Sequence, residues 1–148
     1  MKRLFLLLTM LVYVCFSSPA QSDGTQHVAN IKKVIGEVSI LRNNVHLQAK
    51  PGTQLFSSDT IISSSDASAG ILFTDGTSLA VGPSSEINIE NYLFQPDARR
   101  YDFSLYMNKG SALYSTGKLG KLSPESVKIN TPRATVGVRG TRFIVKVE

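Results

Sequence analysis

Short runs in which apolar and polar residues alternate make up most of the chain from residue 28 onward. Val38 and Ile40 alternate with polar neighbours in the first run, and Phe103, Leu105 and Met107 do so further on. A period of two residues is typical of strands that bury one face. The sequence predicts strands within 34–42, 46–56, 58–73, 77–94, 101–115, 127–132 and 141–148.

Helical periodicity is missing from these runs, because glycine or proline interrupts most windows long enough to hold a helix. Strands of about five residues, spaced about 8 to 12 residues apart, are typical of an all-β domain. We therefore expect an all-β fold of short twisted strands. A sandwich-like and a solenoid-like arrangement both fit, because the sequence has no internal repeat of fixed length.

Turn residues separate the predicted strands. Asn43 and Asn44 tolerate the left-handed backbone of tight turns, and the pair Asp75-Gly76 is a strong signal for a type I′ hairpin. A further turn is predicted at 108–110, inside the run 101–115. The stretch 117–126 is rich in Gly, Ser and Pro and is predicted to be a loop.

The first twenty residues have the three zones of a secretory signal peptide. Lys2 and Arg3 precede an apolar run over 4–16, and small residues, Ser18 and Ala20, stand at the predicted cleavage site. This run is shorter than the roughly 20 residues that cross a bilayer, which disfavours an uncleaved anchor. Lipid attachment at Cys15 is disfavoured because bulky residues precede it. We expect a signal peptide over 1–20, a polar lead over 21–30 and one β domain over 31–148.

Cleavage after Ala20 predicts an exported, periplasmic protein without a transmembrane span in its mature part. Cleavage also removes the single cysteine, so an ordinary apolar core has to stabilise the mature domain. The formal charge falls from +5 to +3 because Lys2 and Arg3 are lost. The remaining basic residues are scattered rather than clustered with aromatic residues, so we expect no nucleic-acid binding.

Residues able to catalyse a reaction or hold a metal are few and isolated. His27 lies in the polar lead and His46 beside a turn, and neither has another ligand type three or four residues away. Glu86 and Glu90 share one face of a predicted strand, as a glycosidase pair would need, but a solvated face explains them more simply. No serine lies in a Gly-x-Ser-x-Gly motif. We expect no catalytic residue, no cofactor and no metal site.

The stretch TPRATVGVRGTRFIVKVE, from Thr131 to Glu148, places Arg139 between Gly137 and Gly140. A phosphate-binding loop would need a lysine and a following helix, whereas the residues after Gly140 alternate like a strand. The two glycines are therefore interpreted as a bulge or a close backbone approach within a β segment. Phe143, Val145 and Val147 are expected to face the core, and Arg139 to meet a carboxylate or a backbone carbonyl.

This tail resembles the closing motif of the FecR domain family, T-P-x-A…G-V-R-G-T-x-F-x-V. ILFTDGTSLAVGPSSEINI resembles the family's D-G-[ST] hairpin, YDFSLYMNKGSALYS its L-x-L-x-x-G segment, and IGEVSILRNN with LFSSDTIIS its opening in stand-alone exported members. The resemblance covers Val34 to Val147 and implies an exported all-β domain. The residues that match the motifs are implied to define the fold: Asp75, Gly76, Gly82, Thr131, Pro132, Gly137, Arg139, Gly140, Thr141 and Phe143.

The resemblance implies a binding or scaffolding role for another protein of the cell envelope. The best-known members span the membrane, sense a loaded outer-membrane transporter and regulate a sigma factor. This sequence shows no anti-sigma segment, so that signalling is not carried over. The alternative is recognition of an envelope polysaccharide or peptidoglycan by Tyr92, Tyr101, Tyr106 and Tyr114. A hydrolase is disfavoured for want of a nucleophile or an acid/base pair.

One route to a protein partner is the last predicted strand, 141–148. If this strand lies at a sheet edge, its unpaired backbone groups can accept a strand from a partner. The opposite expectation is that Lys146 and Glu148 keep the edge charged and unpaired.

Overall fold

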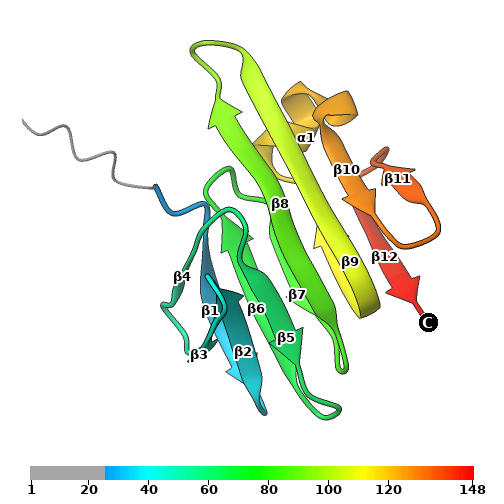
Figure 1. The fold of residues 1–148 in the computed structure, drawn as a ribbon. Helices are drawn as coiled ribbons and strands as arrows, with labels where there is room; N and C mark the ends of the chain where they lie inside the picture. Colours follow the sequence, from blue (N-terminus) through cyan, green and yellow to red (C-terminus); the bar gives the residue numbers. More distant parts are fainter. Residues whose placement is uncertain (1–25) are drawn as a thin grey trace, which may run out of the picture.

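The computed structural model describes residues 26–148, and the predicted signal peptide lies outside these residues. Within them, twelve strands form one sheet that curls like half a barrel (Figure 1). The first strand begins at Ala29, inside the segment predicted as a polar lead, because Val28 and Ala29 are buried in the core.

The curled sheet has two halves that share the strand β9 (Arg100–Ser115). One half also contains β1 (Ala29–Ile35), β4 (Gln54–Leu55), β6 (Ser68–Phe73), β7 (Ser78–Val81) and β12 (Arg142–Val147). The other also contains β2 (Val38–Arg42), β3 (Val45–Gln48), β5 (Thr60–Ser63), β8 (Glu86–Gln95), β10 (Val127–Asn130) and β11 (Thr135–Gly137). Among these strands only β9 and β10 pair in parallel. The all-β prediction is confirmed, and the strands form one curled, almost entirely antiparallel sheet.

The core lies between the two halves and is built from every second residue of most strands. Ile31, Ile71 and Leu79 point into it from one half, and Ile40 and Ile61 from the other, each at most 2% exposed. The alternation predicted for 101–107 and for 86–90 is confirmed, because the apolar residues of both runs are buried. Alternation therefore decides which face of each strand is apolar.

The strand β9 is continuous where a turn was predicted at 108–110. Up to Lys109 it pairs with β8, and after that with β7 and β12. Gly110 has a φ of +97°, and a Cβ at this position would overlap the backbone of Ser85. The glycine therefore marks a kink at which β9 passes from one half of the sheet to the other, and the predicted turn is wrong.

The other predicted turns were located correctly but differ in detail. Asn43 and Asn44 have φ of 49° and 63° in the β2–β3 hairpin, as predicted. In the β6–β7 hairpin only Gly76 has positive φ, and its N–H donates to the Phe73 carbonyl (3.0 Å). The hairpin prediction is therefore confirmed and its type I′ assignment is wrong, since that type needs two residues with positive φ.

The predicted loop 117–126 contains the short helix α1 (Lys118–Leu122) and a 3₁₀ turn, η1 (Pro124–Ser126). Neither is long enough to span a membrane, nor is any other helix of residues 26–148.

Candidate functional site

Asp75 is the centre of a buried polar cluster where the β6–β7 hairpin, β8 and α1 meet. Asp75 is 1% exposed. Its Oδ1 accepts hydrogen bonds from Thr77 N (3.1 Å) and the Tyr92 hydroxyl (3.0 Å), and its Oδ2 from Thr77 Oγ1 (2.7 Å) and Leu119 N (3.0 Å). These donors compensate the cost of removing a carboxylate from water. The carboxylate of the Asp-Gly motif thus connects three elements.

Tyr92 connects β8 to the same hairpin through hydrogen bonds of its hydroxyl group. Its hydroxyl accepts a hydrogen bond from Asp75 N (2.9 Å) and lies 2.9 Å from Thr74 Oγ1. Burial raises the pKa of Tyr92 well above its usual range, and the negative charge of Asp75 adds to this. The hydroxyl therefore stays protonated and continues to donate to the carboxylate.

The start of α1 is held by the hairpin through backbone groups. Lys118 N donates to the Asp75 carbonyl (2.9 Å), and Gly117 N donates to Thr77 Oγ1 (3.1 Å). A Cβ on Gly117 would overlap the Thr77 amide. The segment 117–119 is therefore packed directly on the hairpin.

Gly76 and Gly82, the other two predicted residues of this region, have backbone roles. Gly76 adopts the left-handed conformation with φ of +87°. A Cβ at Gly82 would overlap the Ser111 hydroxyl, and Gly82 N donates to the Ser111 carbonyl (2.8 Å). At both positions the backbone geometry favours glycine.

Thr131 and Pro132 form the turn between β10 and β11. The Thr131 hydroxyl accepts a hydrogen bond from Ala134 N (3.0 Å), and Thr131 N donates to the Ala134 carbonyl (2.8 Å). A threonine hydroxyl that closes a turn in this way fixes the tip of the hairpin.

Gly137, Arg139, Gly140 and Thr141 lie at the connection between β11 and β12. Nothing lies within 4 Å of a Cβ built at either glycine, and Gly140 has a φ of +114°. The predicted bulge or close approach is therefore wrong, and Gly140 is a left-handed residue between two strands. Arg139 is exposed and forms no ion pair within residues 26–148, so the carboxylate predicted for it is not found there.

Phe143 joins the start of β12 to the core, as predicted. Its ring stacks on Tyr114, with 5.0 Å between centroids, and Val145 is 8% exposed. The carbonyls of Gly140 and Thr141 each accept a hydrogen bond from Thr116 (2.9 Å). The start of β12 is therefore anchored to the end of β9.

The side of β12 that faces away from β9 pairs with no strand among residues 26–148. Among the strands of residues 26–148, β12 pairs with β9 alone, and its Ile144 side chain is 72% exposed. A groove of about 400 Å³ lies between the β10–β11 turn and the end of β12, at the side of the sheet where Figure 1 shows β11 and β12. This β11–β12 groove is lined by Thr131, Pro132, Arg133, Ala134, Val136, Val145, Lys146, Val147 and Glu148.

Positive charge is concentrated in the part of the chain that forms this end. Residues 26–117 contain seven basic and eight acidic residues, whereas 118–148 contain seven basic and two acidic ones. The seven are Lys118, Lys121, Lys128, Arg133, Arg139, Arg142 and Lys146, and the two are Glu125 and Glu148. Lys146 and Glu148 form an ion pair (3.1 Å) with both side chains largely exposed, which contributes little to stability.

In a comparison with protein families, residues 59–148 match the FecR protein family. The chain belongs to this family. Comparisons with curated proteins and with solved structures gave no match. The matched range contains the hairpin, the L-x-L-x-x-G segment and the closing motif. Most of the segment likened to the family's opening lies before residue 59, outside that range.

The ten motif residues predicted for this FecR domain form two groups rather than one site. Asp75, Gly76 and Gly82 stabilise the β6–β7 region, while the remaining seven, from Thr131 to Phe143, build the β10–β12 end. Thr131 and Pro132 line the β11–β12 groove, and Gly137 and Arg139 line a second hollow on the other side of β11, of about 390 Å³.

The four tyrosines considered for sugar stacking are spread over the FecR domain. Tyr114 is 0% exposed, Tyr92 holds the Asp75 cluster, and Tyr101 packs against Phe94 with 6.1 Å between centroids. Tyr106 is half-buried on the outer face of the sheet, where β9 pairs with β8 and β10.

Sequence reasoning missed a polar ladder on this outer face. The Glu90 carboxylate accepts hydrogen bonds from Ser104 Oγ (2.5 Å) and Asn130 Nδ2 (2.7 Å), and Thr135 Oγ1 donates to Asn130 Oδ1 (2.9 Å). The ladder connects β8, β9, β10 and β11. Glu90 and Asn130 are 40 positions apart, so no local sequence signal predicts their contact. Of the two glutamates considered as a pair, Glu90 belongs to this ladder and Glu86 does not.

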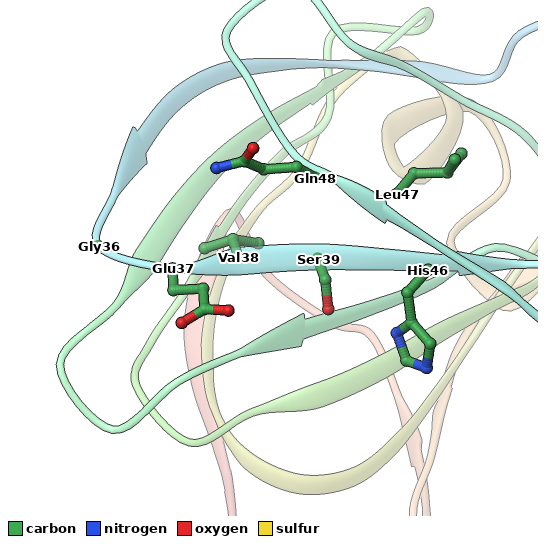
Figure 2. A pocket seen from close by; sticks show the side chains of 7 residues that line it. All are labelled: Gly36, Glu37, Val38, Ser39, His46, Leu47 and Gln48. Carbon is green, nitrogen blue, oxygen red and sulfur yellow. The ribbon is translucent and has the colours of Figure 1, made fainter.

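A further hollow lies at the opposite edge of the domain, between the β1–β2 turn and β3. It has a volume of about 550 Å³ and is lined by Gly36, Glu37, Val38, Ser39, His46, Leu47 and Gln48. Figure 2 shows Glu37, Ser39 and His46 projecting to one side of β2. Most of this lining is exposed, and no group of three His, Cys, Asp or Glu residues within 26–148 is arranged to hold a metal ion.

Proposed function

We propose that this FecR domain is a non-enzymatic module that binds another protein in the cell envelope, and that the partner adds a strand to β12 at residues 141–148. The observation that carries the proposal is the open side of β12, next to the β11–β12 groove and with Ile144 exposed on its outer face. An unpaired strand side offers a row of N–H and C=O groups, and adjoining hollows take side chains. The domain acts in the periplasm after export by the signal peptide over 1–20.

The side chains at this end suit binding better than catalysis. They are exposed arginines and lysines, turn-forming threonines and aliphatic residues, without a hydroxyl placed beside a base in the groove lining. Two charged residues that line the β11–β12 groove, Lys146 and Glu148, form an exposed ion pair with each other. The proposed role is therefore recognition and scaffolding.

Photo-crosslinking in intact cells tests the proposal. Ile144 is replaced by benzoyl-phenylalanine in the full-length chain, with the same replacement at Val45 as the matched control, because Val45 is 56% exposed on the distant strand β3. We expect one protein to be linked from position 144 and not from position 45. Equal linking from both positions, or no linked protein, contradicts the proposal.

Recognition of an envelope glycan is the second candidate, and the position of Tyr106 supports it. This half-buried ring lies on the outer face in register with Asn88 on one neighbouring strand and Asn130 on the other, and the face of an aromatic ring among polar side chains suits a sugar. Retention of the domain on purified sacculi, lost in Tyr106→Ala and kept in Ile144→Ser, would favour this candidate over the protein partner.

A further inference from the structure

We infer that the strand accepted by β12 is acidic, an extended protein segment in which glutamate or aspartate alternates with aliphatic residues. This inference rests on the proposed function for the place of binding and adds the chemistry of the partner. Three features of the β10–β12 end carry it.

The first feature is the alternation of side chains along β12. Phe143, Val145 and Val147 face the core side, whereas Arg142, Ile144 and Lys146 are exposed on the outer face. Residues directly opposite each other on neighbouring strands interact, and opposite charges or apolar pairs are the favourable combinations. A strand beside β12 is therefore matched best by acidic residues opposite Arg142 and Lys146 on the outer face, and by aliphatic residues on its inner face.

The second feature is the composition of the β11–β12 groove. Val136 and Val147 are only partly buried, although both pack against the core. The inward side chains of an added strand would cover them and remove apolar surface from water. Arg133, which is exposed, lines the same groove and adds a positive charge to its rim.

The third feature is the charge of the surrounding segment. The seven basic and two acidic residues of 118–148 create a positive region that attracts an acidic partner and speeds its association at low salt. Glu148 is the one carboxylate in the groove lining, and its exposed pair with Lys146 is weak enough to be exchanged for a carboxylate of the partner.

Peptide probes test the inference directly. Three eight-residue peptides are added to the ¹⁵N-labelled chain without its signal peptide. In the first, valine and glutamate alternate, and in the second, valine and lysine alternate. The third, called the block peptide, has the same composition as the first but places its valines together and its glutamates together. We expect the alternating valine-glutamate peptide to shift the amide signals of 131–136 and 142–148. The lysine peptide is expected not to bind, and the block peptide to bind at least about tenfold more weakly, because it cannot place charge and apolar groups on opposite faces.

Charge reversal supplies the matched variants. The double variant Arg133→Glu, Arg142→Glu is expected to bind the valine-glutamate peptide at least about tenfold more weakly, and Lys50→Glu to bind it unchanged, since Lys50 is an exposed basic residue of a turn outside the β10–β12 end. An unchanged unfolding midpoint establishes that both variants fold. Binding that survives the double reversal, equal binding of the glutamate and lysine peptides, or signal shifts outside 131–148 would overturn the inference.

The outcome of photo-crosslinking separates this inference from the proposed function. A protein linked at position 144 through a segment without acidic residues would leave the proposed function standing and overturn the acidic chemistry. A valine-glutamate peptide that binds as expected, with no protein linked at position 144 in cells, would support the acidic chemistry and remove the proposed function.

Discussion

At the scale of single residues, Asp75 is the side chain of the β6–β7 region that accepts the most hydrogen bonds. Its carboxylate is buried and accepts hydrogen bonds from two backbone amides and two hydroxyls. Hydrogen bonds to a charged group contribute about 1.5–3 kcal/mol each, and an unpaired buried donor costs about 1–3 kcal/mol. Stability should therefore respond to this side chain far more than to the exposed carboxylates of the domain.

Replacing Asp75 by alanine should lower the free energy of unfolding by about 3 kcal/mol or more, because several buried donors lose their acceptor. Urea unfolding followed by circular dichroism measures the change. Asp66→Ala is the matched control, since Asp66 is an exposed carboxylate that accepts a hydrogen bond from Ser64 Oγ. Similar losses in the two variants would contradict the role given to Asp75.

Two glycines with positive φ provide a second comparison. Gly110 (φ +97°) has the backbone of Ser85 where a Cβ would lie, whereas Gly52 (φ +90°) has nothing within 4 Å. Gly52→Ala should cost about 1–2 kcal/mol for the left-handed backbone alone. Gly110→Ala should cost at least about 2 kcal/mol more, because a clash is added. Equal costs in urea unfolding would mean that β9 does not depend on a close approach at its kink.

At the scale of elements, the sequence predicted well where one face of a strand is buried. The alternation of Phe103, Leu105 and Met107 identified the first part of β9, and that of Phe143 and Val145 identified β12. Period-two burial is a local property, so it is visible in a single strand. The same reasoning identified the β2–β3 and β6–β7 hairpins from their turn residues.

Elements that depend on distant contacts were missed. Asn108-Lys109-Gly110 has the composition of a turn, but pairing with β8 and β12 keeps β9 extended through it. The helix α1 is only five residues long and is held by Asp75 from more than 40 positions away. The strand β11 has no alternation of its own and exists because β10 pairs with it. Tertiary contacts determine the middle of β9, the helix α1 and the strand β11. A local sequence pattern contains no information on such contacts.

The link between the hairpin and α1 gives a prediction for hydrogen exchange. In Thr77→Val, the Gly117 amide loses its acceptor, Thr77 Oγ1, so exchange at Gly117 should become about tenfold faster, the effect of one hydrogen bond of about 1.4 kcal/mol. Thr74→Val, at an exposed position of the same hairpin, should leave that amide unchanged. A uniform acceleration of all amides in both variants would contradict a specific link.

At the scale of the whole molecule, stability should fall at alkaline pH. A tyrosine in the unfolded chain ionises near pH 10, whereas burial raises the pKa of Tyr92 in the folded domain. The unfolded state therefore loses its proton first as pH rises. The contribution of Tyr92 is complete below about pH 10 and is lost as pH rises above it toward the folded pKa.

Urea unfolding at a series of pH values from 8 to 11 measures this dependence. The decrease in unfolding free energy above about pH 10 should be smaller in Tyr92→Phe than in the unchanged domain, each compared with its own value at pH 8. Identical decreases would show that Tyr92 does not contribute to it.

The two sides of the molecule also differ in what they offer to a partner. The β3 side carries the exposed Val45 and Leu47, whereas the β12 side combines the exposed Ile144 with arginines and lysines. Both are open strand sides, but the excess of positive charge lies at β10–β12. A partner selected by charge should therefore approach the β12 side.

Hydrogen exchange of residues 141–148, measured with and without the protein captured from position 144, tests the central proposal most directly. Added backbone hydrogen bonds on the open side of β12 should slow exchange along this strand, while exchange in β2 and β3 stays the same. A stable complex in which the amides of 141–148 exchange as fast as in the free domain would contradict strand addition and place the partner on another face.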